Sequence, residues 1–452
     1  MSASKNANGR AEAPRSATAI PIVIAFGLIA CLLYGFGAGF RSDVGILLQP
    51  LAAQCGLRYE DVSLCIAVMQ IVFGGTQPFF GLLAAKRSNR FVLVLGAVVV
   101  AASLLGMVAA RSFAALMLSL GIGFGVGAGA LGFGLVLTSA IRFVGPERAM
   151  MISGMLNAAA GLVGFALSPI LQALLSAGGI PTALCTLLVP VALLIPVAFI
   201  VTSRDPKPTP RRKLRARSGD GARGESGAPD APGEPGELGG SSASDAAAPS
   251  QPSPAKLSTK QMFREAFTNR TFLLLIAGFT TCGFHMVIIE SHLFNQYLLF
   301  GIDATSASWA FSIYGIATIV GALISGWLSA RISMRRLLGF YYGFRAVWVL
   351  AFLLLMPKTL PFAVLFAIGL GITGDATVSP TSGLVNREFR IEYVATLIGV
   401  LFLCHQVGAF LSAWLGGVIL DATGAYTYVW MLDIAACAFA CIMSLRICEP
   451  RD

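Results

Sequence analysis

The stretch AIPIVIAFGLIACLLY, residues 19–34, contains no charged side chain and leads directly into GFGAGFRSDVGILLQP, residues 35–50. The second segment places Arg41 and Asp43 in a sequence that is otherwise apolar. About 20 apolar residues suffice to cross the hydrocarbon core of a bilayer as a helix. Charges inside a membrane are costly and usually functional. This stretch therefore predicts a membrane-spanning helix that carries a functional charge near its end.

The composition extends this interpretation to the whole chain. Hydrophobic residues make up 56% of the 452 residues and charged residues only 12%, with a mean hydropathy of +0.78. About a quarter of the residues in a typical soluble domain are charged. No strand-like alternation is visible, so helices must satisfy the backbone hydrogen bonds within the lipid. We predict an all-α membrane protein with twelve transmembrane helices at residues 19–40, 60–82, 91–110, 113–141, 149–173, 180–202, 270–298, 304–330, 337–357, 361–386, 393–420 and 425–446.

The distribution of basic residues predicts the orientation, because loops rich in Lys and Arg stay in the cytoplasm. With both termini inside, the outer side holds only Arg41, Arg58, Arg111 and Lys358 of the 32 basic residues, and Arg345 lies within a span. We therefore expect a multi-pass protein of the inner (plasma) membrane with cytoplasmic termini. The net charge of +10 follows from this orientation beside anionic lipid, so it gives no reason to invoke nucleic acid.

Residues 203–258 differ from the rest, because Pro, Gly, Ser and charged residues dominate them. Such a segment cannot bury enough apolar surface to fold by itself. Its basic beginning either lies on the lipid surface or only fixes the topology. We therefore divide the chain into a cytoplasmic tail (1–18), a first six-helix bundle (19–202), a disordered cytoplasmic linker (203–265), a second six-helix bundle (266–446) and a cytoplasmic tail (447–452).

The two halves share a repeat. GLLAAKRSNRFVLVLG begins at Gly81 and GWLSARISMRRLLGFY begins at Gly326, and each follows the second span of its half. Internal repeats of parallel topology are typical of major facilitator transporters, whose solute site lies near the membrane midplane between the halves. The chain resembles the major facilitator superfamily, although that family usually has an Asp at the positions of Ala85 and Ala330. The resemblance implies two pseudo-symmetric six-helix bundles.

Three further segments resemble the bacterial monocarboxylate-porter-like branch of this superfamily. They are GFRSDVGILLQPL in the first span (39–51), CGFHMVIIESHLFNQYL in the seventh (282–298) and CHQVGAFLSAWLGGVILDATGAY in the eleventh (404–426). The charged pair that animal members carry on the eighth span has no counterpart in residues 308–328. The resemblance implies transport of a small organic anion.

Several polar side chains fall near the middle of the predicted membrane, as judged from a rise of about 1.5 Å per helical residue. Intramembrane ionisable groups face the bundle interior and are functional candidates by default. The candidates at this depth are Tyr34, His285, Arg345, Asp375, His405 and Gln406.

Arg41 lies farther out along the first span, where a long basic side chain can also extend toward the outer interface. Because the first helix lines the cavity in the family that the chain resembles, we expect Arg41 to attract a solute carboxylate instead. Tyr34, His285, His405 and Gln406 are then expected to complete the binding site. Asp43 is expected to pair with Arg58 in the outer loop.

The remaining ionisable residues suggest coupling and structural roles. An imidazole titrates near neutral pH, so His285 and His405 are candidates both for carrying a proton and for purely structural contacts. Arg345 and Asp375 share a depth on neighbouring spans, which predicts a buried structural ion pair, with proton coupling as the alternative for Asp375. Glu290 is a further candidate for proton coupling, and its position toward the outer end of its span fits a gate and a solvated mouth equally well.

The glycine run GIGFGVGAGALGFG, residues 121–134, follows no strand and carries no phosphate-binding meaning. Small residues in a membrane helix instead allow close packing of backbones. The nine cysteines show no metal-ligand spacing, and nothing indicates a cofactor. No nucleotide motif or nucleophile triad supports an enzyme.

We therefore predict a secondary active transporter that works as a monomer by alternating access and carries a monocarboxylate-like organic anion with a proton. The alternative is import or export of a neutral or amphiphilic solute, such as a vitamin, siderophore or drug. A cavity lined by Phe40, Phe124, Phe133, Phe284 and Phe294 would favour that alternative. A non-transporting sensor would need a signalling domain, and the linker sequence offers none.

Overall fold

The computed structural model describes residues 20–145, 148–205 and 259–448. The predicted tail at 1–18 and most of the predicted linker lie outside these residues. Within them, eleven helices are long and apolar enough to cross a membrane. One of the eleven, Met151–Val201, contains two glycines with non-helical backbone angles and therefore makes two crossings. The described chain is all-helical, as predicted, with twelve crossings.

The first half contains the helices α1 to α8. Their bounds are α1 Ile20–Asp43, η1 Val44–Leu47, α2 Leu48–Cys55, α3 Tyr59–Lys86, α4 Asn89–Ala109, α5 Phe113–Leu116, η2 Met117–Phe124, α6 Gly125–Ala130, α7 Phe133–Val144 and α8 Ala149–Val201. The predicted span 113–141 is therefore divided, because a π-helix (η2) and a break at Leu131–Gly132 interrupt it.

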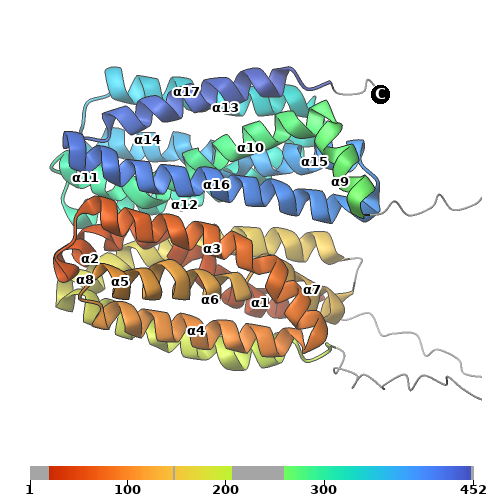
Figure 1. The fold of residues 1–452 in the computed structure, drawn as a ribbon, viewed down its shortest axis with the longest axis horizontal. Coiled ribbons are helices and arrows are strands. Elements are labelled where there is room, and N and C mark those ends of the chain that lie inside the picture. The colour runs from red at the N-terminus through yellow and green to blue at the C-terminus, as the bar shows by residue number, and fades with distance from the viewer. Residues whose placement is uncertain (1–19, 146–147, 206–258, 449–452) are drawn as a thin grey trace, which may run out of the picture.

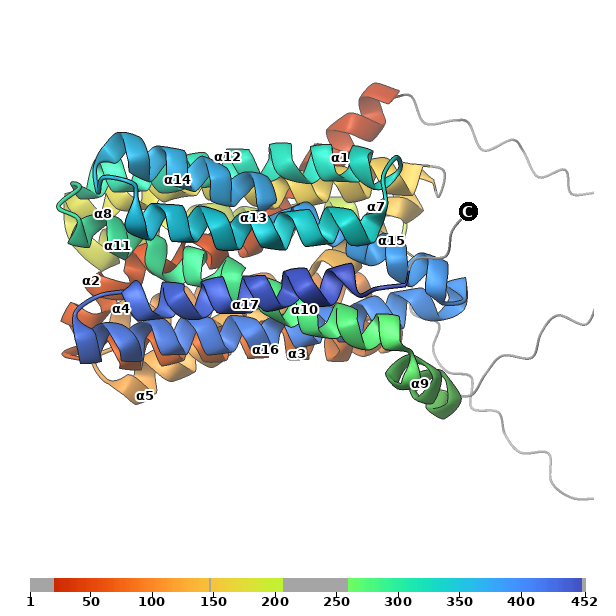
Figure 2. The same ribbon diagram turned by 90° about the horizontal axis from the view of Figure 1, so that it is seen from above.

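The second half contains α9 to α17. Their bounds are α9 Thr259–Thr268, α10 Arg270–Ile288, η4 Ile289–Leu293, α11 Phe294–Leu299, α12 Ala304–Ser329, α13 Met334–Leu354, α14 Leu360–Thr373, η5 Asp375–Thr377, α15 Val378–Glu388, α16 Ile391–Thr423 and α17 Thr427–Leu445. Helix α9 overlaps the end of the predicted disordered linker, so that residues 259–265 are helical instead. Figure 2 shows α9 projecting from the end of the bundles at which α17 ends.

The break inside α8 follows from its glycines. Gly179 has φ 66° and ψ −162°, a combination that residues with a Cβ avoid. Pro181 follows two residues later, and its ring disfavours helical geometry at the residue before it. The chain therefore turns at Gly178–Gly179, between the predicted spans 149–173 and 180–202.

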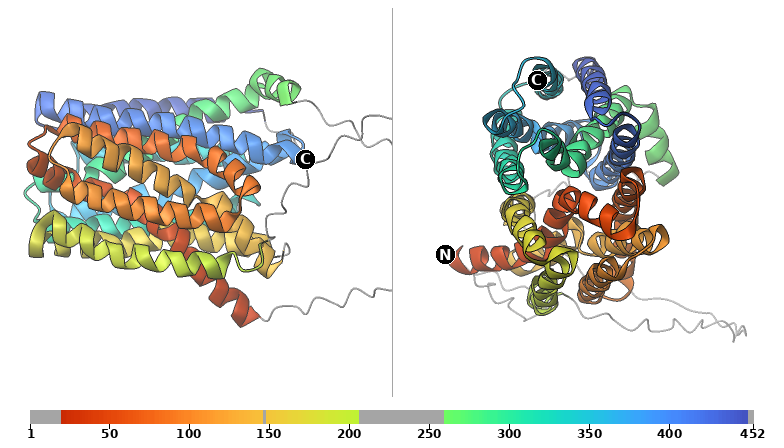
Figure 3. Two further views of the ribbon diagram at one scale, coloured as in Figure 1. Left: turned by 60° about the horizontal axis from the view of Figure 1, so that its bottom comes forward. Right: turned by 90° about the vertical axis from the view of Figure 1, so that its left-hand side faces the viewer.

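Figure 1 shows the two halves as separate layers of long helices, with α1 to α8 below and α10 to α17 above. An end-on view shows each half as its own bundle (Figure 3). We call the end that contains Val201 and Thr259 the linker end, and the opposite end, which contains Cys55 and Leu299, the distal end. The halves meet mainly where α3 packs against α16 and α8 packs against α12.

Glycines bring helices close together, as the sequence predicts. A Cβ on Gly125 would lie 2.9 Å from the carbonyl oxygen of Met69 in α3, and a Cβ on Gly127 would lie 2.9 Å from the backbone nitrogen of Val100 in α4. Between the bundles, a Cβ on Gly161 would lie 3.0 Å from the carbonyl oxygen of Gly315. These distances are below ordinary contact distances, so the backbones pack against each other directly.

Candidate solute-binding site

Arg41 lies near the end of α1, and its guanidinium points to the boundary between the bundles. Its Nη1 donates to Gln70 Oε1 of α3 at 2.9 Å and to Glu290 Oε2 of the second bundle at 2.8 Å. Its Nη2 lies 3.4 Å from Glu290 Oε1. The side chain of Arg41 is 17% exposed and that of Glu290 5%. This position contradicts a snorkelling role for Arg41 at the membrane surface.

Glu290 reaches Arg41 because η4 is a π-helix. A π-turn has i→i+5 hydrogen bonds and so holds more residues than an α-turn, which reorients the side chains within it. The close approach of η4 to η1 also needs Gly45, since a Cβ there would lie 2.5 Å from the carbonyl oxygens of Glu290 and Ser291. Asn295 Nδ2 donates to the carbonyl of Gly45 at 2.8 Å. The two bundles are thereby joined near their distal end.

Further contacts reinforce this connection. Ser42 Oγ donates to Glu290 Oε1 at 3.1 Å, and the backbone N–H of Glu60 donates to Asp421 Oδ2 at 2.8 Å. Ser168 Oγ donates to the carbonyl of Ser308 at 3.1 Å. All of these hydrogen bonds join the two bundles in the distal half of their interface. This arrangement is that of a molecule closed at its distal end.

Three more predicted site residues face the same space as Arg41. Asp375 is exposed although it lies deep within its span, and the charges of Glu290, His405 and Arg41 act on it. His405 is partly exposed, and the charges of Arg41, Glu290 and Asp375 act on it. The same three charges act on Tyr34, whose ring contacts that of Phe133 with centroids 5.4 Å apart. These groups therefore lie close enough to one another to interact electrostatically at the boundary between the bundles, and we call the region around them the shared space (Tyr34, Arg41, Glu290, Asp375, His405).

Gln406 and Gln70 lie beside this space, at the contact between α3 and α16. A Cβ on Gly74 would lie 2.5 Å from Gln406 Cγ, so the glutamine fits over a glycine of the other bundle. Gln406 Oε1, His405 Nδ1, Gln70 Nε2 and Arg41 Nε are buried atoms that have no hydrogen-bond partner within the described chain. Buried polar atoms normally have partners. These four atoms therefore have hydrogen-bonding capacity that the described chain does not satisfy.

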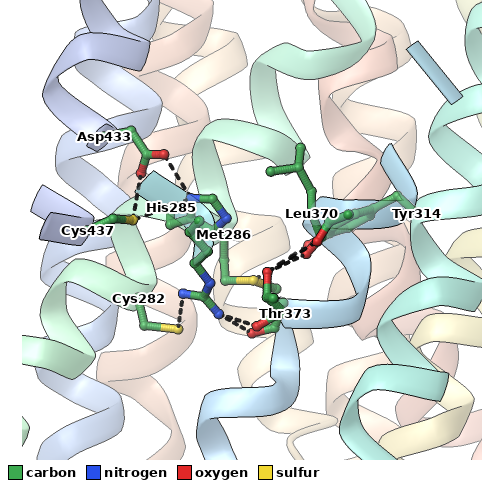
Figure 4. Close-up of polar contacts among 11 residues, drawn as sticks. Cys282, His285, Met286, Tyr314, Leu370, Thr373, Asp433 and Cys437 are labelled. Carbon is green, nitrogen blue, oxygen red and sulfur yellow. Dashed lines mark hydrogen bonds and ion pairs between the residues drawn. The ribbon is translucent and has the colours of Figure 1, made fainter. Parts of the chain in front are cut away.

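His285 lies elsewhere. It is fully buried in the second bundle, where its Nδ1 lies 2.8 Å from Asp433 Oδ2 of α17 (Figure 4). Cys437 Sγ lies 3.8 Å from both side chains. The structure therefore does not bring His285 into the shared space. Asp433 was not among the predicted site residues, although a single carboxylate in the apolar helix Thr427–Leu445 is itself a signal.

The ligand atoms of His285, Asp433 and Cys437 lie within 4.8 Å of one another, close enough to hold a metal ion. Cysteine spacing does not reveal this cluster, because residues of two helices, α10 and α17, contribute to it. The positive charge of Arg345 acts on Cys437, which opposes the binding of a further cation. We therefore interpret the cluster as a buried hydrogen-bonded network.

Arg345 does not form the predicted ion pair with Asp375, because within the described residues the two side chains do not come within the 4.0 Å of a salt bridge. Its Nη2 donates to the carbonyls of Thr373 and Gly374, the latter at 2.7 Å. Helix α14 ends at Thr373, and the last carbonyls of a helix lack partners within it. The buried guanidinium supplies those donors, and Asp375 faces the shared space instead.

Asp43 does not pair with Arg58 either. Arg58 contacts Glu60 at the distal surface, whereas Asp43 is only 2% exposed. Helix α1 continues as η1, and this turn directs Asp43 inward, toward α8, where a Cβ on Gly164 would lie 3.9 Å from Asp43 Oδ1. The other carboxylate oxygen, Oδ2, has no hydrogen-bond partner in the part of the chain that the structure describes.

The aromatic lining expected for an amphiphilic solute is not found as predicted. The side chains of Phe40 and Phe124 are fully buried, with ring centroids 4.7 Å apart, and Phe294 is 3% exposed. These three rings belong to the packed core. Phe133 and Phe284 are partly buried beside that core.

A cavity of about 510 Å³ opens at the linker end of the first bundle. Its lining includes Gln77, Lys86, Arg87, Arg142 and Asp205, and Arg142 pairs with Asp205 at 3.3 Å. On α3 this lining begins at Gln77, about 10 Å along the helix axis from Gln70. The cavity is therefore separate from the Arg41 contacts and is lined by residues of the first bundle.

Comparison with known proteins agrees with this architecture. The family model described as Major Facilitator Superfamily matches residues 27–300 and 294–452. An uncharacterized MFS-type transporter from Bacillus subtilis is 28% identical over 177 residues, which are 37% of this chain and 41% of that protein. Monocarboxylate transporter 12-B from Danio rerio is 28% identical over 169 residues, covering 36% of this chain and 33% of that protein. These matches therefore span less than half of the relatives' length.

Solved structures match over nearly the whole chain. The nucleoside transporter NupG aligns with a TM-score of 0.67 at 13% identity, covering 94% of this chain and 98% of that one. A D-xylose-proton symporter aligns with a TM-score of 0.67 at 11% identity, covering 95% and 98%. A bacterial homologue of the human lysosomal transporter Spinster, inward-facing and unoccupied, aligns with 0.62 at 16%, covering 95% and 96%. At these identities the likeness shows the fold alone.

Proposed function

The chain belongs to the Major Facilitator Superfamily, and from that premise we propose that it carries a small organic anion, such as a monocarboxylate, together with a proton. As a member of this family it is a multi-pass membrane transporter and not an enzyme. Alternating access would expose the shared space first at one end of the molecule and then at the other.

The position of Arg41 is the observation that carries this proposal. Its guanidinium lies between the bundles, partly exposed, and bound to a carboxylate. Guanidinium groups bind carboxylates through two parallel N–H donors, which favours Arg wherever planar anions are recognised. A solute bound there would contact both bundles at once. Its other polar atoms would reach the unpartnered atoms of His405, Gln406 and Gln70.

Proton coupling is the finer part of the proposal. His405, Asp375 and Glu290 face the shared space, and each can gain or lose a proton. A monoanion entering this space brings a negative charge into a site of low dielectric, which a proton can balance. The relatives named monocarboxylate transporter 12 or 12-B support the solute class, since they match about a third of this chain at 25–29% identity.

We further place the linker end and both chain termini in the cytoplasm, with the protein in the inner membrane as a monomer. This orientation rests on the distribution of Lys and Arg described above. The closed distal end then makes this an inward-facing arrangement.

The rival solute class, a neutral or amphiphilic molecule, has less support. Three of the five aromatic side chains expected to line its cavity are packed in the core. The nucleoside transporter and the D-xylose-proton symporter match only in fold, so they do not favour it.

The test is uptake of labelled lactate or pyruvate by proteoliposomes that contain the full chain, with the interior made more alkaline than the exterior. We expect accumulation that depends on the pH gradient, and we expect Arg41→Ala to abolish it. Absence of uptake by the wild-type chain for both solutes would overturn the proposal. Full uptake by Arg41→Ala would overturn the role of the guanidinium.

A further inference from the structure

The guanidinium of Arg41 already holds a carboxylate that belongs to the protein. Nη1 is shared between Gln70 Oε1 and Glu290 Oε2, and Nη2 lies 3.4 Å from Glu290 Oε1. Glu290 therefore occupies the fork of Nη1 and Nη2 that would give a solute carboxylate two parallel hydrogen bonds, since the alternative fork includes Nε, which is buried. A solute cannot form that pair while Glu290 remains in place.

Near Arg41, carboxyl groups outnumber the single positive charge of its guanidinium. Asp43 and Glu290 are buried, and Asp375 is the third carboxylate within electrostatic range of Glu290. Of these three described carboxylates, the guanidinium of Arg41 forms a salt bridge with Glu290 alone. An unpaired carboxylate in such a place is energetically costly and takes up a proton instead. The charge of the Arg41 guanidinium is therefore already balanced by Glu290 and does not also balance the charge of a solute anion.

These two observations lead to one inference, which rests on the proposed function and deepens it. We propose that Glu290 carries the coupled proton, and that its carboxylate and the carboxylate of the solute occupy Arg41 in turn. When the solute binds, Glu290 leaves the guanidinium and accepts one proton on a carboxylate oxygen. When the solute departs, Glu290 releases that proton and pairs with Arg41 again. The guanidinium stays protonated throughout, so one proton accompanies each monoanion.

The surroundings of Glu290 agree with such an exchange. Ser42 Oγ bonds to Glu290 Oε1, and it can donate to the carboxylate or accept from the carboxylic acid, because a hydroxyl does both. The charged and titratable groups that face Glu290 from the neighbouring elements are Tyr34, Arg41 and Asp43 of α1, Tyr314 of α12, Asp375 of η5 and His405 of α16. His292 of η4 points away, toward the carbonyl of Ala413.

Asp43 provides a matched control. It is a carboxylate of the same neighbourhood, but among the described residues it has no salt-bridge partner and its Oδ2 has no hydrogen-bond partner. Because a buried carboxylate without a partner is costly, we expect Asp43 to be neutral, so that an amide in its place changes little. The pair Glu290→Gln and Asp43→Asn therefore compares the same chemical change at a group that exchanges its proton and at one that keeps it.

The experiment uses proteoliposomes with the full chain and labelled lactate, and measures both accumulation driven by a pH gradient and lactate exchange at equal pH. For Glu290→Gln we expect accumulation to fall to the level without a gradient, while exchange changes by less than about threefold because the neutral amide still vacates Arg41. Asp43→Asn should keep both activities. Gradient-driven accumulation by Glu290→Gln at the wild-type level would overturn the inference, as would loss of coupling in Asp43→Asn alone.

A second measurement needs no variant. Addition of lactate to the purified wild-type protein in weakly buffered detergent solution should remove about one proton per bound anion from the medium, as linkage requires when the liganded state binds more protons. Binding without proton uptake would overturn the inference. The proposed function fails separately, if the wild-type chain neither binds nor transports the anion. A Glu290→Gln protein that folds but loses exchange as well would also count against competition for Arg41.

Discussion

Nδ1 of His285 lies 2.8 Å from Oδ2 of Asp433, and both side chains are fully shielded from solvent inside the second bundle. The contact joins α10 to α17. His285 precedes Glu290 along the seventh crossing by about one and a half helical turns. Removing one member of such a buried pair is costly, because the other member then has neither a protein partner nor water to hydrogen-bond with. Replacing both members of the pair by well-packed apolar residues changes the free energy of unfolding much less.

We therefore expect Asp433→Ala to lower the free energy of unfolding by about 3–5 kcal/mol, since it leaves His285 without its partner. The double variant His285→Leu, Asp433→Leu should recover most of that loss. Equilibrium unfolding in mixed detergent micelles measures both. Equal losses for the single and double variants would contradict the role of the pair.

Arg345 offers a test of the corrected ion-pair prediction. Because the guanidinium caps the carbonyls that end α14 and makes no salt bridge with Asp375, Arg345→Met should cost about 2–4 kcal/mol by leaving buried carbonyls unpaired. Asp375→Asn should change the unfolding free energy by less than about 0.5 kcal/mol. The same unfolding assay applies. A large loss in Asp375→Asn would mean that the two residues are paired after all.

Gly45 should tolerate no side chain. A methyl group there meets the carbonyl oxygens of Glu290 and Ser291, so Gly45→Ala should force η1 away from η4 at a cost of about 1–3 kcal/mol. Gradient-driven lactate uptake should fall with it, since Arg41 and Glu290 are then moved apart. Gly75→Ala is the control, because nothing in the described chain lies within 4 Å of a Cβ at that position. Unchanged uptake by Gly45→Ala would contradict the direct backbone contact.

Substitution of His405 tests whether this imidazole takes part in proton coupling in addition to Glu290. Its Nδ1 is buried and has no partner among the residues that the structure describes, so we expect it to hydrogen-bond the solute. His405→Gln should raise KM for lactate about tenfold, the equivalent of about 1.4 kcal/mol for one hydrogen bond, and leave pH-gradient coupling intact. Concentration-dependent uptake with and without the gradient separates the two effects. Loss of coupling in His405→Gln would assign the proton to the imidazole.

Much of the architecture follows from the sequence, because lipid permits few alternatives. Long apolar spans, the repeated segments that begin at Gly81 and Gly326, and the glycine run at 121–134 specify two helical bundles with close contacts. The interruptions of the helices were not predictable in the same way. The π-turn at Ile289–Leu293 and the break after Thr373 depend on contacts with other helices, and local composition does not reveal them.

Several residues of the candidate site were predictable from the sequence, but the contacts between them were not. Depth along a helix singled out Asp375 and His405, and the family resemblance singled out Arg41. The structure places all three close enough to interact electrostatically. Depth alone carries no information about which face of a helix a residue occupies. For this reason it grouped His285 with the site and paired Arg345 with Asp375, whereas rotation about the helix axis separates them.

The π-turn at Ile289–Leu293 makes the register of the seventh crossing part of its chemistry. Deletion of a single residue within this turn would restore regular α-helical geometry and rotate the preceding side chains by about 100° relative to those that follow. Asn295 and the distal packing would then keep their orientation only if Glu290 lost its own. We therefore expect that the loss of one codon would remove the competition between Glu290 and the solute for the guanidinium of Arg41.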